Sequence, residues 1–342
     1  MPPGLKVLSP GLCTTVQDLG RFGQQALGVP VSGALDGLAL RLANALVGNP
    51  PGTAALEILL SGPTFEVVAG RVRLALAGDG AGLVLAGGST APGWQSCTLV
   101  RGEVFRIAVG RQSACAYLAV EGGIAVPLVL ASASTYVRAG LGGFEGRALR
   151  GGDIVPLAVE SPAERAESRL PAPPPADPER PIRVVLGPQQ EYFTDDAVAT
   201  LLGAEFRISQ SADRMGMRLD GPALRHREGW DIVSDAIATG AIQVPGSGQP
   251  ILLLADHQTT GGYPKIATVV SADLPAVGHR RPGDSIRFQP VTVEEAEQLA
   301  RDQDRQLAAL MARLEPVAEA ADIDLGMLYA GNLISGVVSG CP

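Results

Sequence analysis

The sequence of 342 residues has little charge for its length, and this shortage excludes several classes of protein. Charged residues make up 18% of the chain and hydrophobic residues 46%, a balance that excludes intrinsic disorder. The formal net charge of −8 excludes the basic surface that nucleic-acid binding requires. Gly, Pro or charged residues interrupt every apolar run before it reaches the ~18 residues of a membrane-spanning helix. Because no basic residue precedes an apolar run at the start of the chain, we also expect no signal peptide.

Cysteine, histidine and lysine are scarce. The four cysteines (Cys13, Cys97, Cys115 and Cys341) show no CxxC spacing, and the three histidines are far apart. We therefore expect no metal site and a reduced, cytoplasmic protein. There is no P-loop motif and no G-x-S-x-G nucleophile motif. Lys6 and Lys265 are the only lysines in a chain that otherwise uses arginine.

Glycine and proline are abundant, with 43 and 27 residues, and they separate short runs of Val, Ile, Leu and Ala. This pattern predicts a mainly β fold with few helices. The segment 161–181 is charged, rich in proline and without periodicity, which is typical of a linker. We therefore expect an N-terminal β lobe over 1–160, a C-terminal β lobe over 182–290 and a helical tail over 291–342.

Three helices have clear end signals. Asp36 can cap a helix over 36–47, and a second helix should begin after Thr194 and end near Gly203. In the tail, Thr292 and Glu295 form a capping box before an apolar stripe that includes Leu307 and Leu310. This last helix should pack on the β lobes or on a partner.

Three polar, glycine-containing clusters are candidates for function. In the first, over 14–36, Asp18 and Arg21 can pair across a turn, and Ser32 and Asp36 lie at the start of the first helix. The favoured interpretation of this cluster is structural, as a salt bridge across the turn and a helix cap. In the second, over 209–219, Asp213 and Arg214 can seat a carboxylate or phosphate, or they can form an exposed turn held by packed methionines.

The third cluster, over 256–265, carries the strongest signal. Between two apolar strands it places an acid, an imidazole, an amide, two hydroxyls, a phenol and an ammonium. A plain connection needs only about two to five residues, so this loop indicates a site. Lys265 strengthens that interpretation because a compact, titratable ammonium stands where the chain usually has arginine. Gln243 alternates with apolar neighbours, so it faces away from the core, toward solvent or a cleft. We expect the second and third clusters to meet on one concave surface.

The same segments resemble a known family. The blocks TTVQDLGRFG, GVPVSGALD, SQSADRMGMRLDGP and ADHQTTGGYPKIATV are similar to the allophanate hydrolase subunit 2 family, whose members are also called KipA-like proteins or the C subunit of 5-oxoprolinase. The resemblance implies two cyclophilin-like β-barrel lobes and a KipI-like partner subunit. It covers about 7–288, and its matching motifs include twelve candidate site residues: Asp18, Arg21, Ser32, Asp36, Asp213, Arg214, Gln243, Asp256, Gln258, Thr259, Tyr263 and Lys265.

For these residues the side-chain chemistry suggests roles. We expect Asp256 to act as a base and, with Lys265 and Tyr263, to be catalytic, and we expect the other nine residues to bind substrate. The function expected first is that of a subunit of an ATP-dependent 5-oxoprolinase, which also uses a LamB/YcsF-like subunit. One alternative is a carboxyltransferase component that uses biotin carried on another chain and acts on urea or a related amide. The other is a non-catalytic partner of a KipI-like kinase inhibitor.

Overall fold

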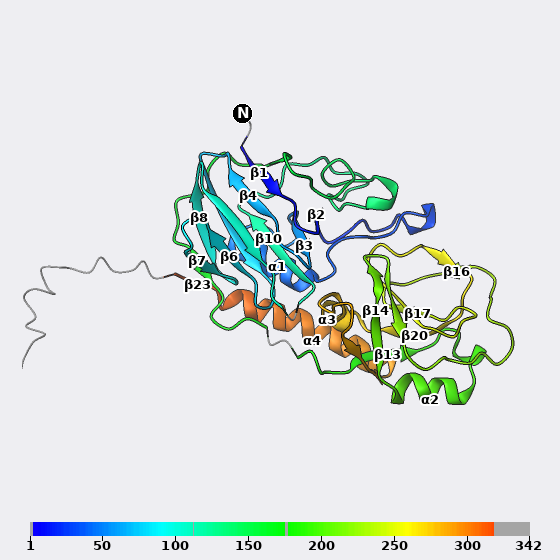
Figure 1. Cartoon of the computed structure of the whole chain (residues 1–342). Helices are drawn as coiled ribbons and strands as arrows, with labels where there is room; N and C mark the ends of the chain where they lie inside the picture. The colour runs from blue at the N-terminus through cyan, green and yellow to red at the C-terminus, as the bar shows by residue number, and fades with distance from the viewer. Residues whose placement is uncertain (1–2, 112, 175–176, 318–342) are drawn as a thin grey trace, which may run out of the picture.

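The chain folds into two β lobes that a long C-terminal helix connects (Figure 1). The computed structural model describes residues 3–111, 113–174 and 177–317. Strands dominate in both lobes, which confirms the expected mainly β fold. Among the described residues, no helix is both long and apolar enough to cross a bilayer.

The N-terminal lobe contains two antiparallel sheets. One has six strands in the order β11-β1-β4-β9-β6-β7, and the other has five in the order β2-β3-β10-β5-β8. The bounds in the first sheet are β1 (Gly4–Ser9), β4 (Thr64–Val67), β6 (Gly82–Leu85), β7 (Thr90–Pro92), β9 (Val104–Ala108) and β11 (Ile154–Pro156). Those in the second are β2 (Cys13–Gln17), β3 (Ala55–Leu59), β5 (Arg71–Ala77), β8 (Ser96–Val100) and β10 (Cys115–Val120).

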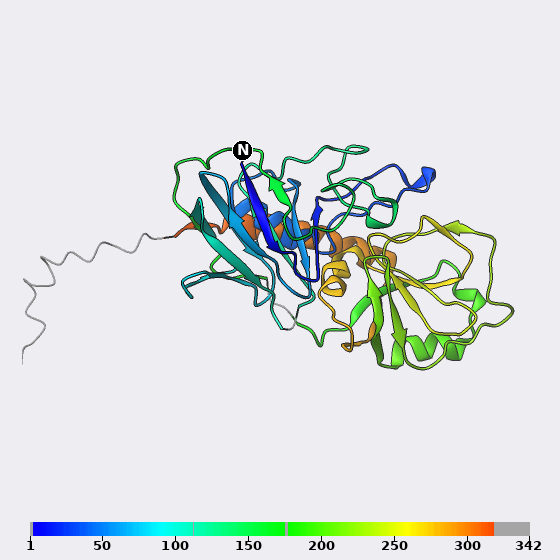
Figure 2. The ribbon, with the colours of Figure 1, turned by 45° about the horizontal axis from the view of Figure 1, so that its top comes forward.

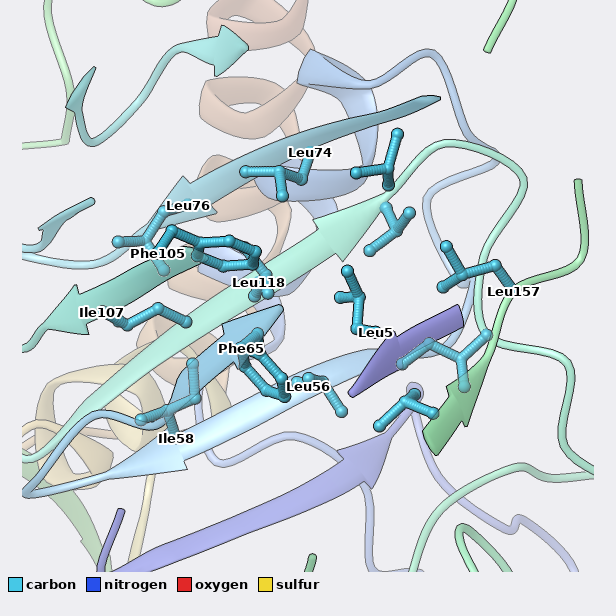
Figure 3. Close-up of a cluster of buried hydrophobic side chains, with 14 of the residues drawn as sticks. Leu5, Leu56, Ile58, Phe65, Leu74, Leu76, Phe105, Ile107, Leu118 and Leu157 are labelled. Atoms are coloured by element: carbon cyan, nitrogen blue, oxygen red, sulfur yellow. The ribbon is translucent and has the colours of Figure 1, made fainter. Parts of the chain in front are cut away.

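The main core of this lobe lies between its two sheets (Figure 3). Phe65 and Phe105 of the six-stranded sheet stack with ring centroids 5.5 Å apart, and they lie in one buried cluster with Leu56 and Leu118 of the five-stranded sheet. Along β5, leucines face this core and alanines face the other way, so that the opposite face of the sheet is flat enough for a helix to pack closely.

That helix is α1 (Gly37–Leu46), and it begins where the sequence predicts. The carboxylate of Asp36 accepts hydrogen bonds from the amides of Leu38 and Ala39, both at 2.9 Å. Leu42 and Leu46 are fully buried against the alanine face of the five-stranded sheet. The five-stranded sheet is therefore covered on both sides.

The C-terminal lobe is built on one eight-stranded sheet with the order β21-β14-β15-β18-β17-β20-β13-β22. All neighbouring strands are antiparallel except β13 and β22. The bounds are β13 (Ile182–Leu186), β14 (Phe206–Asp213), β15 (Gly216–Asp220), β17 (Ala241–Gln243), β18 (Ile251–Leu253), β20 (Lys265–Val269), β21 (Ser285–Ile286) and β22 (Phe288–Pro290). A small ribbon pairs β16 (Asp235–Ala236) with β19 (Thr260–Gly261). Helices α2 (Asp195–Gly203, capped by Thr194 as predicted) and α3 (Leu274–Gly278) complete the lobe.

Helix α4 (Val293–Ala312) runs from the C-terminal lobe back to the N-terminal lobe, and Figures 1 and 2 both show it against the two lobes. Its predicted capping box between Thr292 and Glu295 is present. Gln303 donates to the carbonyl of Ala272 in the C-terminal lobe, and Leu307 and Leu310 are buried against α1. The helix therefore fixes one lobe against the other.

The proline-rich segment predicted as a linker is partly ordered against the N-terminal lobe. Its strand β12 (Ser168–Arg169) pairs with β23 (Glu315–Pro316), just after α4. The buried Arg73 also donates to Glu167 and to the carbonyls of Ala163 and Arg165. A single buried guanidinium thus holds a segment whose own composition carries no folding signal. The expected tail continues over 318–342, outside the described residues.

Candidate functional site

A buried ion-pair network joins the two lobes. We call Glu57, Tyr117, Arg214 and Asp256 the junction cluster. Arg214, from the turn between β14 and β15, donates to both oxygens of Asp256, at 2.9 and 3.1 Å, and also to Glu57 of β3 in the other lobe. Tyr117 of β10 donates to the second oxygen of Glu57 at 2.6 Å. The predicted meeting of the second and third polar clusters therefore includes a direct contact between Arg214 and Asp256.

The junction cluster holds two carboxylates against one guanidinium in a nearly dry environment. Arg214 is 6% exposed, Asp256 4% and Glu57 0%. Burial lowers the pKa of Arg214, but the charges of Glu57 and Asp256 outweigh it and raise that pKa above its usual value. Burial and the neighbouring Glu57 raise the pKa of the Tyr117 phenol well above its usual value. Arg214 thus stays charged, and Tyr117 stays a hydrogen-bond donor.

Glu57 and Tyr117 are not among the residues predicted from the sequence. Their signal is a polar side chain inside an apolar strand: Glu57 within ALEIL and Tyr117 within CAYLAV. A buried carboxylate needs a partner. In this fold Arg214 lies 157 residues further along the chain from Glu57, so local pattern cannot supply that partner.

A second polar contact between the lobes runs through His279, which lies just after α3. Its Nε2 is 2.6 Å from Asp36 Oδ2, and its Nδ1 is 2.6 Å from Ser113 Oγ. Burial lowers the pKa of His279, but Cys115 and Asp36 raise it by more, to well above its usual value. Because burial raises the pKa of the Cys115 thiol, that thiol is uncharged at neutral pH, and Asp36 is the anion that His279 meets. Asp36, predicted to bind substrate, therefore caps α1 and pairs with an imidazolium.

This pairing predicts a pH dependence of stability. A group whose pKa is raised by folding contributes stability that is complete below its unfolded pKa, about 6.5 for histidine, and that is lost as pH rises through the folded value. Replacing His279 with Asn should therefore cost more free energy of unfolding at about pH 6 than at about pH 9. Urea denaturation at both pH values measures this difference, with His226→Asn as the control. An equal cost at the two pH values would contradict the ion pair.

The loop over 256–265 forms a separate group of contacts, the loop cluster: Asp235, Gln243, Gln258, Tyr263 and Lys265. Gln258 donates to the side-chain oxygen of the buried Gln243, at 3.2 Å, and Gln243 donates to the carbonyl of Tyr263, also at 3.2 Å. The Lys265 side chain is 2% exposed, and its ammonium donates to Asp235 at 2.8 Å and to the carbonyl of Ala236 at 3.1 Å. Gln243 thus turns toward the loop, on the side away from its apolar neighbours.

His257 stabilises this loop as a neutral imidazole. Its Nδ1 lies 2.6 Å from the carbonyl of Gln258, so Nδ1 carries the proton and donates it. Its Nε2 then accepts from the hydroxyl of Thr239, at 3.1 Å. Burial lowers the pKa of His257, which keeps the ring uncharged at neutral pH. The ring connects Thr239 to the loop cluster by hydrogen bonds.

Asp18 and Arg21 do not pair with each other, so the predicted salt bridge across the turn is wrong. The Asp18 oxygens accept from Gly20, Ser132, Ala133 and Ser134 instead. Arg21, which is fully buried, donates to the carbonyls of Val129 and Ser134 at 3.0 and 2.8 Å. Both side chains bind the same returning segment of the N-terminal lobe and so fix the loop that follows them.

That loop reaches the other lobe. It contains η1 (Gln25–Leu27), and in Figures 1 and 2 it extends toward the end of the C-terminal lobe that carries β16. The amide of Ser32 donates to the carbonyl of Ala255 at 3.0 Å, next to Asp256. Arg214 also donates to the carbonyl of Gly33, at 2.7 Å. The first cluster of the sequence therefore meets the second and third at the junction of the lobes.

The remaining predicted site residues lie at the edge of this arrangement. Asp213 is exposed, and its carboxylate accepts from the amides of Met215 and Gly216 in the hairpin turn. Thr259 accepts a hydrogen bond from the amide of Ile237 through its backbone carbonyl. Tyr263 is 38% exposed and lies beside Trp230, with ring centroids 6.0 Å apart. The exposed ring is accessible to a ligand or partner.

Known proteins are similar to this chain in sequence and in fold. The chain is 37% identical over 287 residues to the C subunit of 5-oxoprolinase from Haemophilus influenzae, covering 84% of this chain and 91% of that protein. A solved structure of TTHA0988 superposes with a TM-score of 0.75 at 38% identity over 84% of this chain, which spans 55% of that one. The K. lactis urea amidolyase superposes with a TM-score of 0.83 at 30% identity over 90% of this chain, which spans 20% of that enzyme. The family model described as "Carboxyltransferase domain, subdomain A and B" matches residues 27–290, and the chain belongs to that family.

Proposed function

We propose that this chain is the counterpart of the C subunit in an ATP-dependent 5-oxoprolinase, the enzyme that opens 5-oxoproline to glutamate. The observation that carries the proposal is the match to the Haemophilus influenzae protein over 91% of that protein's length. In the proposed enzyme, ATP is a co-substrate of the assembled complex. A KipI-like subunit and a LamB/YcsF-like subunit are the proposed partners.

The hydrogen bonds suggest different roles for Asp256 and for the residues of the loop cluster. Both oxygens of Asp256 accept hydrogen bonds from Arg214, so the main role of Asp256 is to hold the two lobes together. Its role as a base stays a prediction. The ammonium group of Lys265 has three N–H donors. Two of them bind Asp235 and the carbonyl of Ala236. The third can hold an anionic or carbonyl oxygen of a substrate. The exposed Tyr263 and the linked amides of Gln243 and Gln258 are further positioning groups.

A second candidate is a carboxyltransferase that moves a carboxyl group from biotin carried on another chain to urea or a related amide. The close superposition of this chain on part of the K. lactis urea amidolyase favours it. Both reactions require an amide or urea group to be held while charge develops on its oxygen, which fixed hydrogen-bond donors stabilise. The fold alone does not choose between these reactions.

Reconstitution separates the two candidates. The chain is co-expressed with a KipI-like and a LamB/YcsF-like subunit, purified by size-exclusion chromatography, and assayed for ATP hydrolysis that depends on 5-oxoproline. Co-elution with such turnover is the expected result. Activity that instead requires a biotinylated carrier and urea supports the carboxyltransferase, and a stable complex without either activity contradicts both.

A further inference from the structure

A small cavity lies between the two lobes, beside the junction cluster. Its volume is about 220 Å³, and its walls come from the segment 32–35, α1, Thr239, the two residues before Asp256, the segment 271–275 and α4. Most lining residues are apolar, and the uncharged polar ones are Ser32, Thr239, Ser271 and Gln303. A pocket with apolar walls and a few fixed polar groups is the usual form of a small-molecule site.

Arg41 is the one charged side chain among the described residues that line this cavity. It projects from α1, and within the described part of the chain no carboxylate or carbonyl forms an ion pair or hydrogen bond with its guanidinium. In this protein the buried Arg73 and Arg214 both meet carboxylates. Arg41 is half-buried and lines the cavity without such a partner, so its guanidinium donors are left for a carboxylate ligand there.

Ser32 provides a second, independent observation. Its side chain is 5% exposed, and its Oγ is buried without a hydrogen-bond partner among the described residues. Buried hydroxyl groups normally have a hydrogen-bond partner, and a ligand atom can supply the partner that this hydroxyl lacks. The backbone of Ser32 also has φ of +54°, in the left-handed region that residues other than glycine rarely adopt. Such strained positions cluster where a ligand is bound.

Thr239 connects this cavity to the loop cluster. Thr239 lines the cavity, and its hydroxyl donates to His257, whose other ring nitrogen donates to the carbonyl of Gln258. The neutral His257 accepts the Thr239 proton, so the hydroxyl oxygen keeps its lone pairs for a donor on the ligand. A lactam N–H is such a donor.

We infer that this cavity binds a small cyclic amide that carries one carboxylate, with Arg41 holding the carboxylate and Ser32 and Thr239 contacting the amide. The single positive charge, the hydroxyl groups and the apolar walls match the three parts of such a ligand: its carboxylate, its amide and its ring methylenes. This inference rests on the proposed function, since 5-oxoproline belongs to this class. It places the bound ring in the cavity next to the loop cluster, whose own side chains do not line it.

Calorimetric titration of the purified protein with 5-oxoproline and with 2-pyrrolidinone, which lacks the carboxylate, tests the inference. We expect 5-oxoproline to bind and 2-pyrrolidinone not to bind. Arg41→Leu should weaken 5-oxoproline binding by about 10- to 100-fold, since a hydrogen bond to a charged group is lost. Arg41→Lys should recover part of the loss, Ser32→Ala should weaken binding by about 3- to 10-fold, and the exposed control Arg71→Leu should not change it.

Turnover in the assembled complex separates the inference from the proposed function. If the wild-type complex hydrolyses 5-oxoproline and Arg41→Leu leaves both KM and calorimetric binding unchanged, the cavity inference is overturned and the proposed function stands. If the wild-type complex does not turn over 5-oxoproline, yet the chain binds it in a way that depends on Arg41, the proposed function fails and the carboxylate site stands. Absence of binding and of turnover in the wild type overturns both.

Discussion

Replacing Arg214 with methionine should destabilise the folded chain by about 3–5 kcal/mol, because it leaves two buried carboxylates without their cation. Glu57 and Asp256 are both almost fully buried, and each receives hydrogen bonds from Arg214. A typical domain is stable by only about 5–15 kcal/mol, so the loss should be evident as a lower urea midpoint and a lower soluble yield. Urea denaturation followed by circular dichroism measures it.

Arg218→Met is the matched control, because Arg218 lies in the adjacent strand and is exposed. We expect its effect to be within about 0.5 kcal/mol. If Arg214→Met is too unstable to measure, combining it with Glu57→Gln and Asp256→Asn should restore soluble protein, since removing the stranded charges removes most of the penalty. A single variant as stable as the wild type would contradict the view that this cluster holds the lobes together.

The helix starts could be predicted from the sequence because their signals are local. Asp36, Thr194 and the pair Thr292 and Glu295 each act within four residues of the amides they cap. The mainly β character follows in the same way from short apolar runs between glycines and prolines. In each case the interaction and its signal lie in one short segment.

The lobe junction could be predicted only in part. The polar loop over 256–265 and the turn at Arg214 stand out as polar segments between apolar strands, and the structure brings them into contact. The partners of Glu57 and His279 could not be predicted, because they lie in the opposite lobe. The pattern of a single sequence does not identify the distant charged residue with which a buried acid will pair. The predicted pairing of Asp18 with Arg21 fails for the same reason, because both side chains bind partners far along the chain.

Lys265 is the residue whose replacement should reduce turnover most. In the assembled complex, Lys265→Ala should lower kcat/KM by about 10²–10³-fold, the range found when a fixed donor to developing charge is removed. The chain should stay folded, because the partner Asp235 is half-exposed and can be hydrated when the ammonium is gone. Steady-state kinetics with 5-oxoproline and ATP, together with the urea midpoint, measures the two effects separately.

The choice of a conservative variant makes this test specific. Lys265→Arg keeps the charge but replaces a compact ammonium with a planar guanidinium, which does not fit the enclosed position between Asp235 and the carbonyl of Ala236, so we expect little recovery. Lys6→Ala is the control, since Lys6 is the other lysine of the chain and pairs with Glu66 at the surface. If Lys265→Ala keeps full turnover, the ammonium only anchors β20 to β16. If Lys265→Arg is fully active, the site requires a positive charge alone and not the geometry of lysine.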